Sequence, residues 1–214
     1  MVRRGPLITL AAVVVLAAVL LAVNVSKEDD DATPAPAPAA TAAPDSTTTT
    51  TATPAAVEFP AQATYVGRIP VATGTLTLAI AVEGGDAVAY ACDGSAIESW
   101  LAGDADAGRL DLEGREGARL DGDFDGETVR GTLWLGDRSW TFDAAPAEPP
   151  AGLYLANVGD VRASWIVTQD GTVTGVLRGG DGGTTPAPAL APDGTAVVDG
   201  ETVTADPVSG SDTF

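Results

Sequence analysis

The sequence predicts an all-β protein, an antiparallel meander forming a β-barrel or a β-sandwich, preceded by one transmembrane helix and a disordered stalk. Three observations support this prediction. Residues 7–25 carry no charge, residues 26–56 are rich in Ala, Pro and Thr, and residues 57–214 consist of short alternating runs separated by Gly and Asp. Alternation with a period of two is typical of strands, and no window of the last region keeps the 3.6-residue period of a helix.

The N-terminal segment predicts a membrane anchor. The run "LITLAAVVVLAAVLLAVNV" at 7–25 follows Arg3 and Arg4. It is long enough to cross a bilayer, and the two arginines favour a cytoplasmic location for residues 1–6. We therefore expect a single-pass protein of the cell membrane whose C-terminal domain is extracellular. The alternative is a cleaved signal peptide and a secreted protein, although the apolar core is long and "LLAVNVS" is a poor cleavage site.

Residues 26–56 predict a stalk. They include "DATPAPAPAATAAPDSTTTTTATPAA", which has almost no large apolar side chain and cannot bury enough surface to fold. Alternating Ala and Pro favour the extended polyproline II conformation, with about 3.1 Å per residue. The threonine run is either a tract for O-glycosylation or a bare spacer.

Residues 57–214 predict the folded all-β domain. "TLTLAIAVEGGDAVAYAC" at 75–92 predicts a hairpin about Gly84 and Gly85, and both faces of its apolar arms should be covered. The segment "APAEPPAG" at 145–152 either divides two subdomains or marks a corner. Further strands are expected near 63–69, 97–102, 108–113, 118–124, 127–135, 138–143, 151–157, 161–168, 172–178 and 195–206.

Composition excludes several functional classes. The chain has 30 acidic and 11 basic residues, no His, and Lys27 as its single Lys. His-based catalysis, His-ligated metals and a Ser-Lys dyad within the folded part are therefore excluded. The net charge of −19 opposes nucleic acid as a partner. The single cysteine, Cys92, forms no intramolecular disulfide and is either a small buried hydrophobe or a thiol that pairs between chains.

The stretch "LDGDFDGETVRG" at 120–131 supports two interpretations. Asp121, Asp123 and Asp125, followed by Gly126, match the start of an EF-hand calcium loop. However, position twelve is Thr132 where a bidentate Glu is needed, and the flanks read as strands. The same "DG" pattern returns at 170, 193 and 199 without the preceding aspartates, which favours a turn. Calcium binding by the three aspartates stays open as the weaker hypothesis.

The turn interpretation makes a definite prediction about register. A two-residue type I′ turn at Asp125-Gly126 places Phe124 opposite Glu127 and Asp121 opposite Arg130. A second turn at Gly136-Asp137 pairs Leu133 with Trp140. The apolar side then holds Leu120, Gly122, Phe124, Val129, Leu133, Leu135, Trp140 and Phe142.

Two further candidate sites follow from the same pattern. Trp134 falls on the polar face with Thr132, Ser139 and Thr141, where its ring could stack on a sugar; the alternative is packing beneath a strand or loop. Glu98, within apolar "IESW", is the best-placed acid for carboxylate catalysis of glycoside hydrolysis, although an acid-rich domain makes chance pairs common. Trp100 and Trp165 lie in apolar runs and are expected in the core.

Several motifs resemble a group of uncharacterised actinobacterial membrane-anchored or secreted proteins. They are "YVGR" at 65–68, "AYACDG" at 89–94, "ESWL" at 98–101, "PAGLY" at 150–154 and "WIV" at 165–167. The resemblance covers most of residues 63–206 and implies an anchored β-rich domain. It implies no catalytic residues and no cofactor. Varied residues at positions 121 and 123 in that group further weaken the calcium hypothesis.

These observations favour a non-enzymatic, membrane-anchored module that binds a glycan or a protein of the cell envelope. A carboxylate-based hydrolase acting on cell-wall glycan is the first alternative, and a calcium-binding adhesion module is the second. No cofactor is expected.

Overall fold

The computed structural model describes residues 57–214. The predicted transmembrane segment at 7–25 and the predicted stalk at 26–56 lie outside the described residues. Within 57–214 no helix is long and apolar enough to cross a bilayer. This part of the chain is all-β and antiparallel, as predicted, with one short 3₁₀ turn, η1 (Arg115–Gly117).

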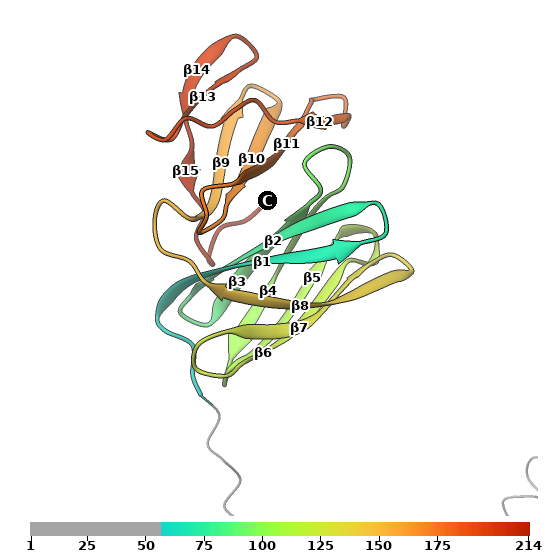
Figure 1. The fold of residues 1–214 in the computed structure, drawn as a ribbon, viewed down its shortest axis with the longest axis vertical. Coiled ribbons are helices and arrows are strands. Elements are labelled where there is room, and N and C mark those ends of the chain that lie inside the picture. The colour runs from blue at the N-terminus through green and yellow to red at the C-terminus, as the bar shows by residue number, and fades with distance from the viewer. Residues whose placement is uncertain (1–56) are drawn as a thin grey trace, which may run out of the picture. The chain divides into compact units, whose positions relative to one another are not determined.

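The first eight strands form a closed barrel (Figure 1). Each strand pairs with the next one in sequence, and β1 pairs with β8 to close the ring. The barrel alternative of the prediction therefore holds for this region. The strands are β1 (Gln62–Val71), β2 (Gly74–Glu83), β3 (Asp86–Cys92), β4 (Glu98–Asp106), β5 (Arg109–Gly114), β6 (Arg119–Phe124), β7 (Val129–Leu135) and β8 (Arg138–Pro146).

Alternate side chains of these strands fill the barrel interior. Leu78 and Ile80 of β2 point into a core with the leucines of β5, β6 and β7, while Ala79 between them lies in a different cluster outside the barrel. Most residues of β2 and β3 are buried, including runs of seven and six consecutive residues. The prediction that the 75–92 hairpin is covered on both faces is therefore confirmed.

A second sheet follows the barrel, and the "APAEPPAG" segment connects the two. Its order is β12-β11-β10-β9-β15, with a separate hairpin β13-β14. The predicted strand at 195–206 is corrected to this hairpin followed by β15, because Asp199 and Gly200 reverse the chain. The strands are β9 (Gly152–Val158), β10 (Val161–Val167), β11 (Val173–Arg178), β12 (Thr184–Pro186), β13 (Thr195–Val198), β14 (Glu201–Thr204) and β15 (Asp206–Pro207).

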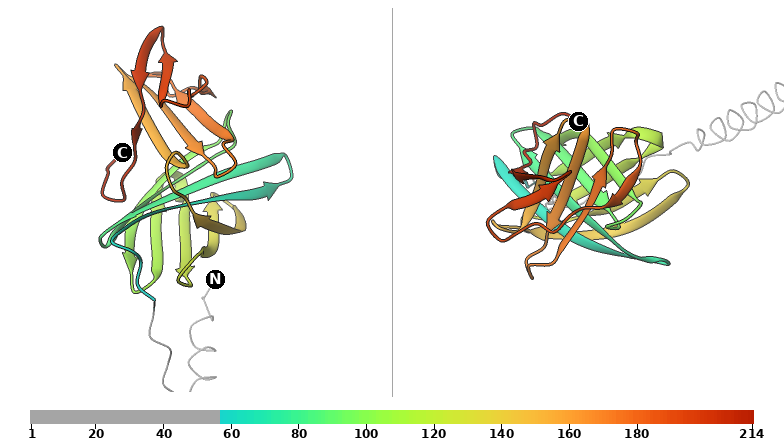
Figure 2. Two further views of the ribbon diagram at one scale, coloured as in Figure 1. Left: turned by 60° about the vertical axis from the view of Figure 1, so that its left-hand side comes forward. Right: turned by 90° about the horizontal axis from the view of Figure 1, so that it is seen from above.

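The second sheet packs on the outside of the barrel (Figure 2). Leu153, Ile166 and Val176 meet the outward side chains of β1, β2 and β3 in one apolar layer. Cys92 lies in this layer, fully buried, so its prediction as a small buried hydrophobe is confirmed. Trp165 is buried on the opposite face of the sheet against the β13-β14 hairpin, as expected of a core residue. Trp100 is only half-buried, which places it at the margin of the core.

Candidate functional site

The 120–131 stretch forms a hairpin, but its register differs from the prediction. Phe124 pairs with Val129 and Asp123 pairs with Arg130, so the loop contains Asp125 to Thr128. The pairing of Phe124 with Glu127 and of Asp121 with Arg130 is therefore wrong. The assignment of side chains to faces is correct, because the register shift is even and keeps the same residues facing the core. Leu133 pairs with Trp140, as predicted.

The wider loop has a clear local cause. The Asp125 carboxylate accepts hydrogen bonds from the backbone N–H groups of Glu127 and Thr128, at 3.0 and 2.8 Å. Such an aspartate turn lets four residues reverse the chain. The carboxylates of Asp170 and Asp193 likewise accept a hydrogen bond from the backbone N–H two residues later in the chain. A two-residue reversal with positive φ at both positions occurs instead at Asp199-Gly200, where φ is 49° and 80°.

The three aspartates of the calcium hypothesis are each engaged by an arginine. Asp121 accepts from Arg119 at 2.9 Å, Asp123 lies 3.2 Å from Arg109, and Asp125 pairs with Arg130. Within residues 57–214 no group of three or more acidic, Cys or His side chains is arranged to hold a metal ion. The geometry therefore gives the calcium hypothesis no support.

The predicted Trp134 cluster lies on paired strands of the barrel exterior. Trp134 pairs with Ser139, and Thr132 pairs with Thr141, so the four side chains are neighbours on β7 and β8. Arg119 lies over the Trp134 ring, 5.9 Å from its centre. The half-buried ring thus already has a cationic neighbour, and glycan stacking at this surface stays a prediction.

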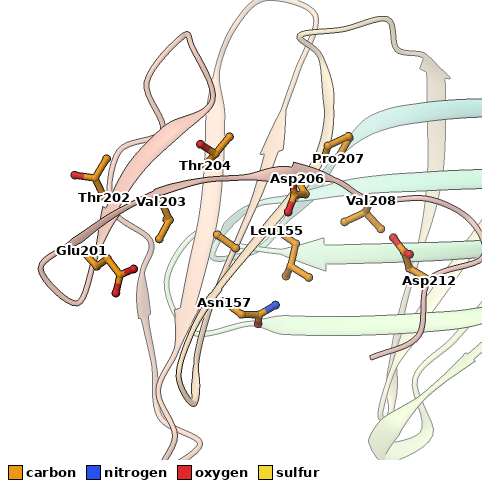
Figure 3. Close-up of a pocket in the computed structure, with 11 residues that line it drawn as sticks. Leu155, Asn157, Glu201, Thr202, Val203, Thr204, Asp206, Pro207, Val208 and Asp212 are labelled. Atoms are coloured by element: carbon orange, nitrogen blue, oxygen red, sulfur yellow. The ribbon is translucent and has the colours of Figure 1, made fainter.

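A hollow of about 400 Å³ lies beside β9, β14 and β15 (Figure 3). Glu201, Asp206 and Asp212 line it together with Asn157 and two threonines. No basic side chain is among its lining residues, so it offers acidic groups without a balancing charge.

Glu98 occupies the most distinctive position in the described chain. Its side chain is 1% exposed and lies between two arginines of the second sheet. Arg178 Nε donates to Oε2 at 2.5 Å, and Arg162 donates to Oε1 at 3.4 Å. Trp100 Nε1 and the Tyr90 hydroxyl lie 3.3 and 3.5 Å from Oε1. Both carboxylate oxygens are thus occupied by donors, which suits an anchor between barrel and sheet better than a proton donor.

Burial sets the pKa values of two groups close to Glu98, the Tyr90 hydroxyl and the Cys92 thiol. Desolvation, reinforced by the nearby Cys92 and Glu98, raises the pKa of the Tyr90 hydroxyl far above its ordinary value. Desolvation also raises the pKa of the Cys92 thiol to about 12. Neither group is a nucleophile near neutral pH, because both stay protonated there.

A cleft of about 860 Å³ opens above this anchor. It runs from the rim of the barrel to the second sheet, and residues 96–102 and most of 113–118 form its barrel side. Ile97, Leu101 and Leu135 give it an apolar floor that continues the barrel core. Phe214 also lines it and stacks on Trp100, with ring centres 4.0 Å apart.

The cleft lining carries a small excess of positive charge, a formal +1, in an acidic domain. Residues 57–214 hold 25 acidic residues and 8 arginines, a formal charge of −17, yet the lining holds four arginines and three glutamates. Two of these arginines bind Glu98. The other two, Arg115 and Arg138, are exposed and have no carboxylate partner among residues 57–214. The remaining four arginines of this part all form ion pairs, as Arg68 does with Asp170.

The sequence singled out Glu98 but missed its partners. Arg162 and Arg178 are 64 and 80 residues away along the chain, so no local pattern connects them to Glu98. The apolar context of "IESW" was the available signal, since a buried carboxylate requires a cationic partner. No sequence signal distinguished Arg115 and Arg138 from the other arginines.

Comparison with protein-family models, with curated proteins and with solved structures finds no match for this chain.

Proposed function

We propose that the chain is a non-enzymatic, membrane-anchored extracytoplasmic module that binds an acidic ligand of the cell envelope in the cleft above Glu98. The observation that carries this proposal is the position of Arg115 and Arg138. They are the described arginines without a carboxylate partner, and both line the same apolar-floored cleft. Unpaired cations beside apolar surface form a site for an anion, whose binding weakens as salt is added.

The test compares two double variants of the full chain in mild detergent. Arg115→Gln with Arg138→Gln removes the cleft charges, while Arg109→Gln with Arg130→Gln removes two charges from exposed ion pairs elsewhere. Calorimetry with polyglutamate and with polygalacturonate supplies an acidic peptide and an acidic glycan. We expect the cleft variant to lose at least about tenfold in affinity and the control to stay near wild type. Equal losses in both variants would reject the cleft as the site.

The contacts of Glu98 favour binding over hydrolysis. Glycoside hydrolysis needs one carboxyl group that donates a proton and a second that acts as base or nucleophile. The Glu98 carboxylate is instead enclosed by arginines and covered from solvent. Glycan release from cell-wall fragments that disappears in Glu98→Gln, with the fold intact by circular dichroism, would favour the hydrolase.

The membrane location is tested separately from the cleft. Fractionation of cells and protease treatment of intact cells should place the chain in the membrane with residues 57–214 accessible from outside. The N-terminal sequence of the mature protein distinguishes the anchor from the alternative, because a cleaved signal peptide would remove residues 7–25.

A further inference from the structure

Phe214 reaches the cleft on a short arm, residues 208–214, which returns from the second sheet to the barrel. The backbone N–H of Val208 donates to Leu153 O on β9 at 2.9 Å, so the start of the arm is fixed to the second sheet. The ring of Phe214 stacks on Trp100 of β4, with ring centres 4.0 Å apart. The arm therefore connects the second sheet to the barrel wall and carries Phe214 into the cleft.

The middle of the arm is fixed to the turn between β2 and β3. The hydroxyl groups of Ser209 and Ser211 both donate to the Glu83 carboxylate. A Cβ atom at Gly210 would lie 2.3 Å from Glu83 N and 2.7 Å from Asp86 O, which is too close for any side chain. Only glycine lets the backbone of the arm approach the barrel this closely.

The part of the arm that carries Phe214 is held differently. Thr213 and Phe214 form no hydrogen bond with any other described residue, and both are exposed to solvent. The Phe214 side chain remains 40% exposed although it stacks on Trp100. The arm thus has a fixed base, while the ring at its other end can leave the cleft without breaking a hydrogen bond to the described residues.

The Trp100 ring beneath Phe214 is a platform of fixed orientation. The Tyr90 ring centre lies 4.4 Å from that of Trp100 and the Phe214 ring centre lies 4.0 Å from it, so the two rings occupy opposite faces of the indole. Trp100 Nε1 also donates to the buried Glu98 carboxylate at 3.3 Å. Because Tyr90 is fully buried, the face covered by Phe214 is the one that a ligand can reach.

Positive charge lies beside this platform. The Arg162 guanidinium is 5.3 Å from the centre of the Trp100 ring and lines the same cleft. Arg162 and Arg178 carry two positive charges against the single negative charge of Glu98, so a formal +1 remains next to the ring. An aromatic ring that belongs to an acidic molecule therefore suits this position better than one that belongs to a cationic molecule.

We propose that the face of Trp100 beneath Phe214 is a subsite for an aromatic side chain of an acidic peptide, and that Phe214 occupies this subsite until the peptide displaces it. The inference rests on the proposed function, since it uses the same cleft and names the class of its ligand. The occupant of the subsite is a flat aromatic ring, inclined by 27° to the indole. Peptides supply such rings, whereas acidic glycans do not.

The attachment of Phe214 to the arm explains how one ring can compete with a ligand. A tethered group binds intramolecularly, at an effective concentration of about millimolar for a short flexible link. The apparent affinity of a ligand falls in proportion to the fraction of molecules in which its subsite is free. Removal of the Phe214 ring should therefore strengthen the binding of a peptide that uses Trp100.

The test is calorimetry on the full chain in mild detergent with two peptides, a glutamate decapeptide and the same decapeptide with one central phenylalanine. We expect Phe214→Ala to bind the phenylalanine peptide at least about threefold more tightly than the wild type does. Its affinity for the all-glutamate peptide should stay near that of the wild type. Val197→Ala is the matched control, because it shortens another exposed apolar side chain, on β13, outside the cleft lining.

A second variant and a direct contact measurement test the displacement itself. Gly210→Ala should loosen the arm by steric conflict with the barrel backbone and should act like Phe214→Ala, although the Phe214 ring is retained. In NMR spectra of the full chain, the nuclear Overhauser effect between the Phe214 and Trp100 rings should disappear when the phenylalanine peptide saturates the cleft. Binding of that peptide with this contact retained would overturn the displacement.

The remaining outcomes separate this inference from the proposed function. Equal affinity of Phe214→Ala for the two peptides would overturn the aromatic subsite and keep the cleft as an anion site. An affinity for the phenylalanine peptide that Phe214→Ala does not change would overturn the role of Phe214 as an occupant. A gain confined to polygalacturonate would place a sugar ring on Trp100 and overturn the peptide class. Failure of both peptides and of polygalacturonate to bind would overturn the proposed function as well.

Discussion

Acid–arginine pairs occur in two settings in this protein, and the settings differ in burial. On the barrel exterior, Arg109, Arg119 and Arg130 pair with aspartates whose side chains are 36% to 75% exposed. Between barrel and second sheet, two arginines enclose Glu98, which is 1% exposed. Exposed pairs gain little because water screens them, while a buried carboxylate that loses its partners is costly. We therefore expect the buried group of Glu98, Arg162 and Arg178 to contribute more to stability than the exposed pairs.

Removal of the Glu98 charge should give the largest effect. Glu98→Gln leaves Arg162 and Arg178 facing each other without a carboxylate, at 24% and 39% exposure. We expect a loss of about 3 kcal/mol in the free energy of unfolding, measured by urea denaturation. Asp143→Asn is the matched control, because it neutralises an exposed partner of Arg130. Similar losses of stability in Glu98→Gln and Asp143→Asn would contradict the expected difference between buried and exposed ion pairs.

The rate at which the Cys92 thiol is labelled should report how tightly the second sheet packs on the barrel. Burial raises the pKa of this thiol to about 12, so the reactive thiolate is scarce at a pH of about 8. We expect Ellman's reagent to react at least about 100-fold more slowly than with a free cysteine thiol. Glu98→Gln should accelerate the reaction by loosening the sheet, and an unchanged rate would show that Glu98 does not hold the two layers together.

Arg130 should contribute little to stability in spite of two ion pairs. It bonds Asp143 at 2.8 Å and also pairs with Asp125, but its side chain is 58% exposed. Arg130→Ala should cost about 0.2 to 1 kcal/mol in urea denaturation, and the difference should shrink in high salt. A loss as large as that of Glu98→Gln would remove the distinction between the two settings.

The smallest effect should come from acid titration of the Asp125 loop. Backbone N–H groups of Thr128 and Glu127, with Arg130, lower the pKa of Asp125 well below its ordinary value. Since the folded pKa is below the unfolded value of about 3.9, this stabilisation is complete above that pH and is lost as the pH falls through the folded pKa. Carbon-detected NMR titration should show that Asp125 becomes protonated at a lower pH than an Asp in an unstructured chain. Asp125→Asn should make the free energy of unfolding depend less steeply on pH in the acidic range. An ordinary midpoint would contradict the loop geometry.

Alternation made much of the barrel predictable. Leu120, Val129 and Leu133 were assigned to the buried face because a period of two leaves no other choice once one face is apolar. The turn at Asp125-Gly126 was predicted with the wrong length, because the dipeptide alone does not reveal that the aspartate carboxylate holds two backbone amides. The same dipeptide at Asp199-Gly200 does form the shorter turn.

Tertiary pairing explains what the sequence did not reveal about the cleft. Glu98 stood out in its apolar run, but its arginines come from a different sheet. The predicted strand boundaries also differ from the observed ones by several residues at some ends.

The seam between β1 and β8 bears on how the chain folds. Three residue pairs close it, from Tyr65–Pro146 to Gly67–Ala144, whereas ten pairs join β1 to β2. Every other ladder of the barrel connects strands that follow one another in sequence, so hairpins can form locally and early. The seam has to bring together residues some 80 positions apart, an entropic cost that local ladders avoid. We therefore expect ring closure to be slower than the formation of the hairpins. The second sheet docks on β1, β2 and β3, a wall that local hairpins can build before the ring is closed.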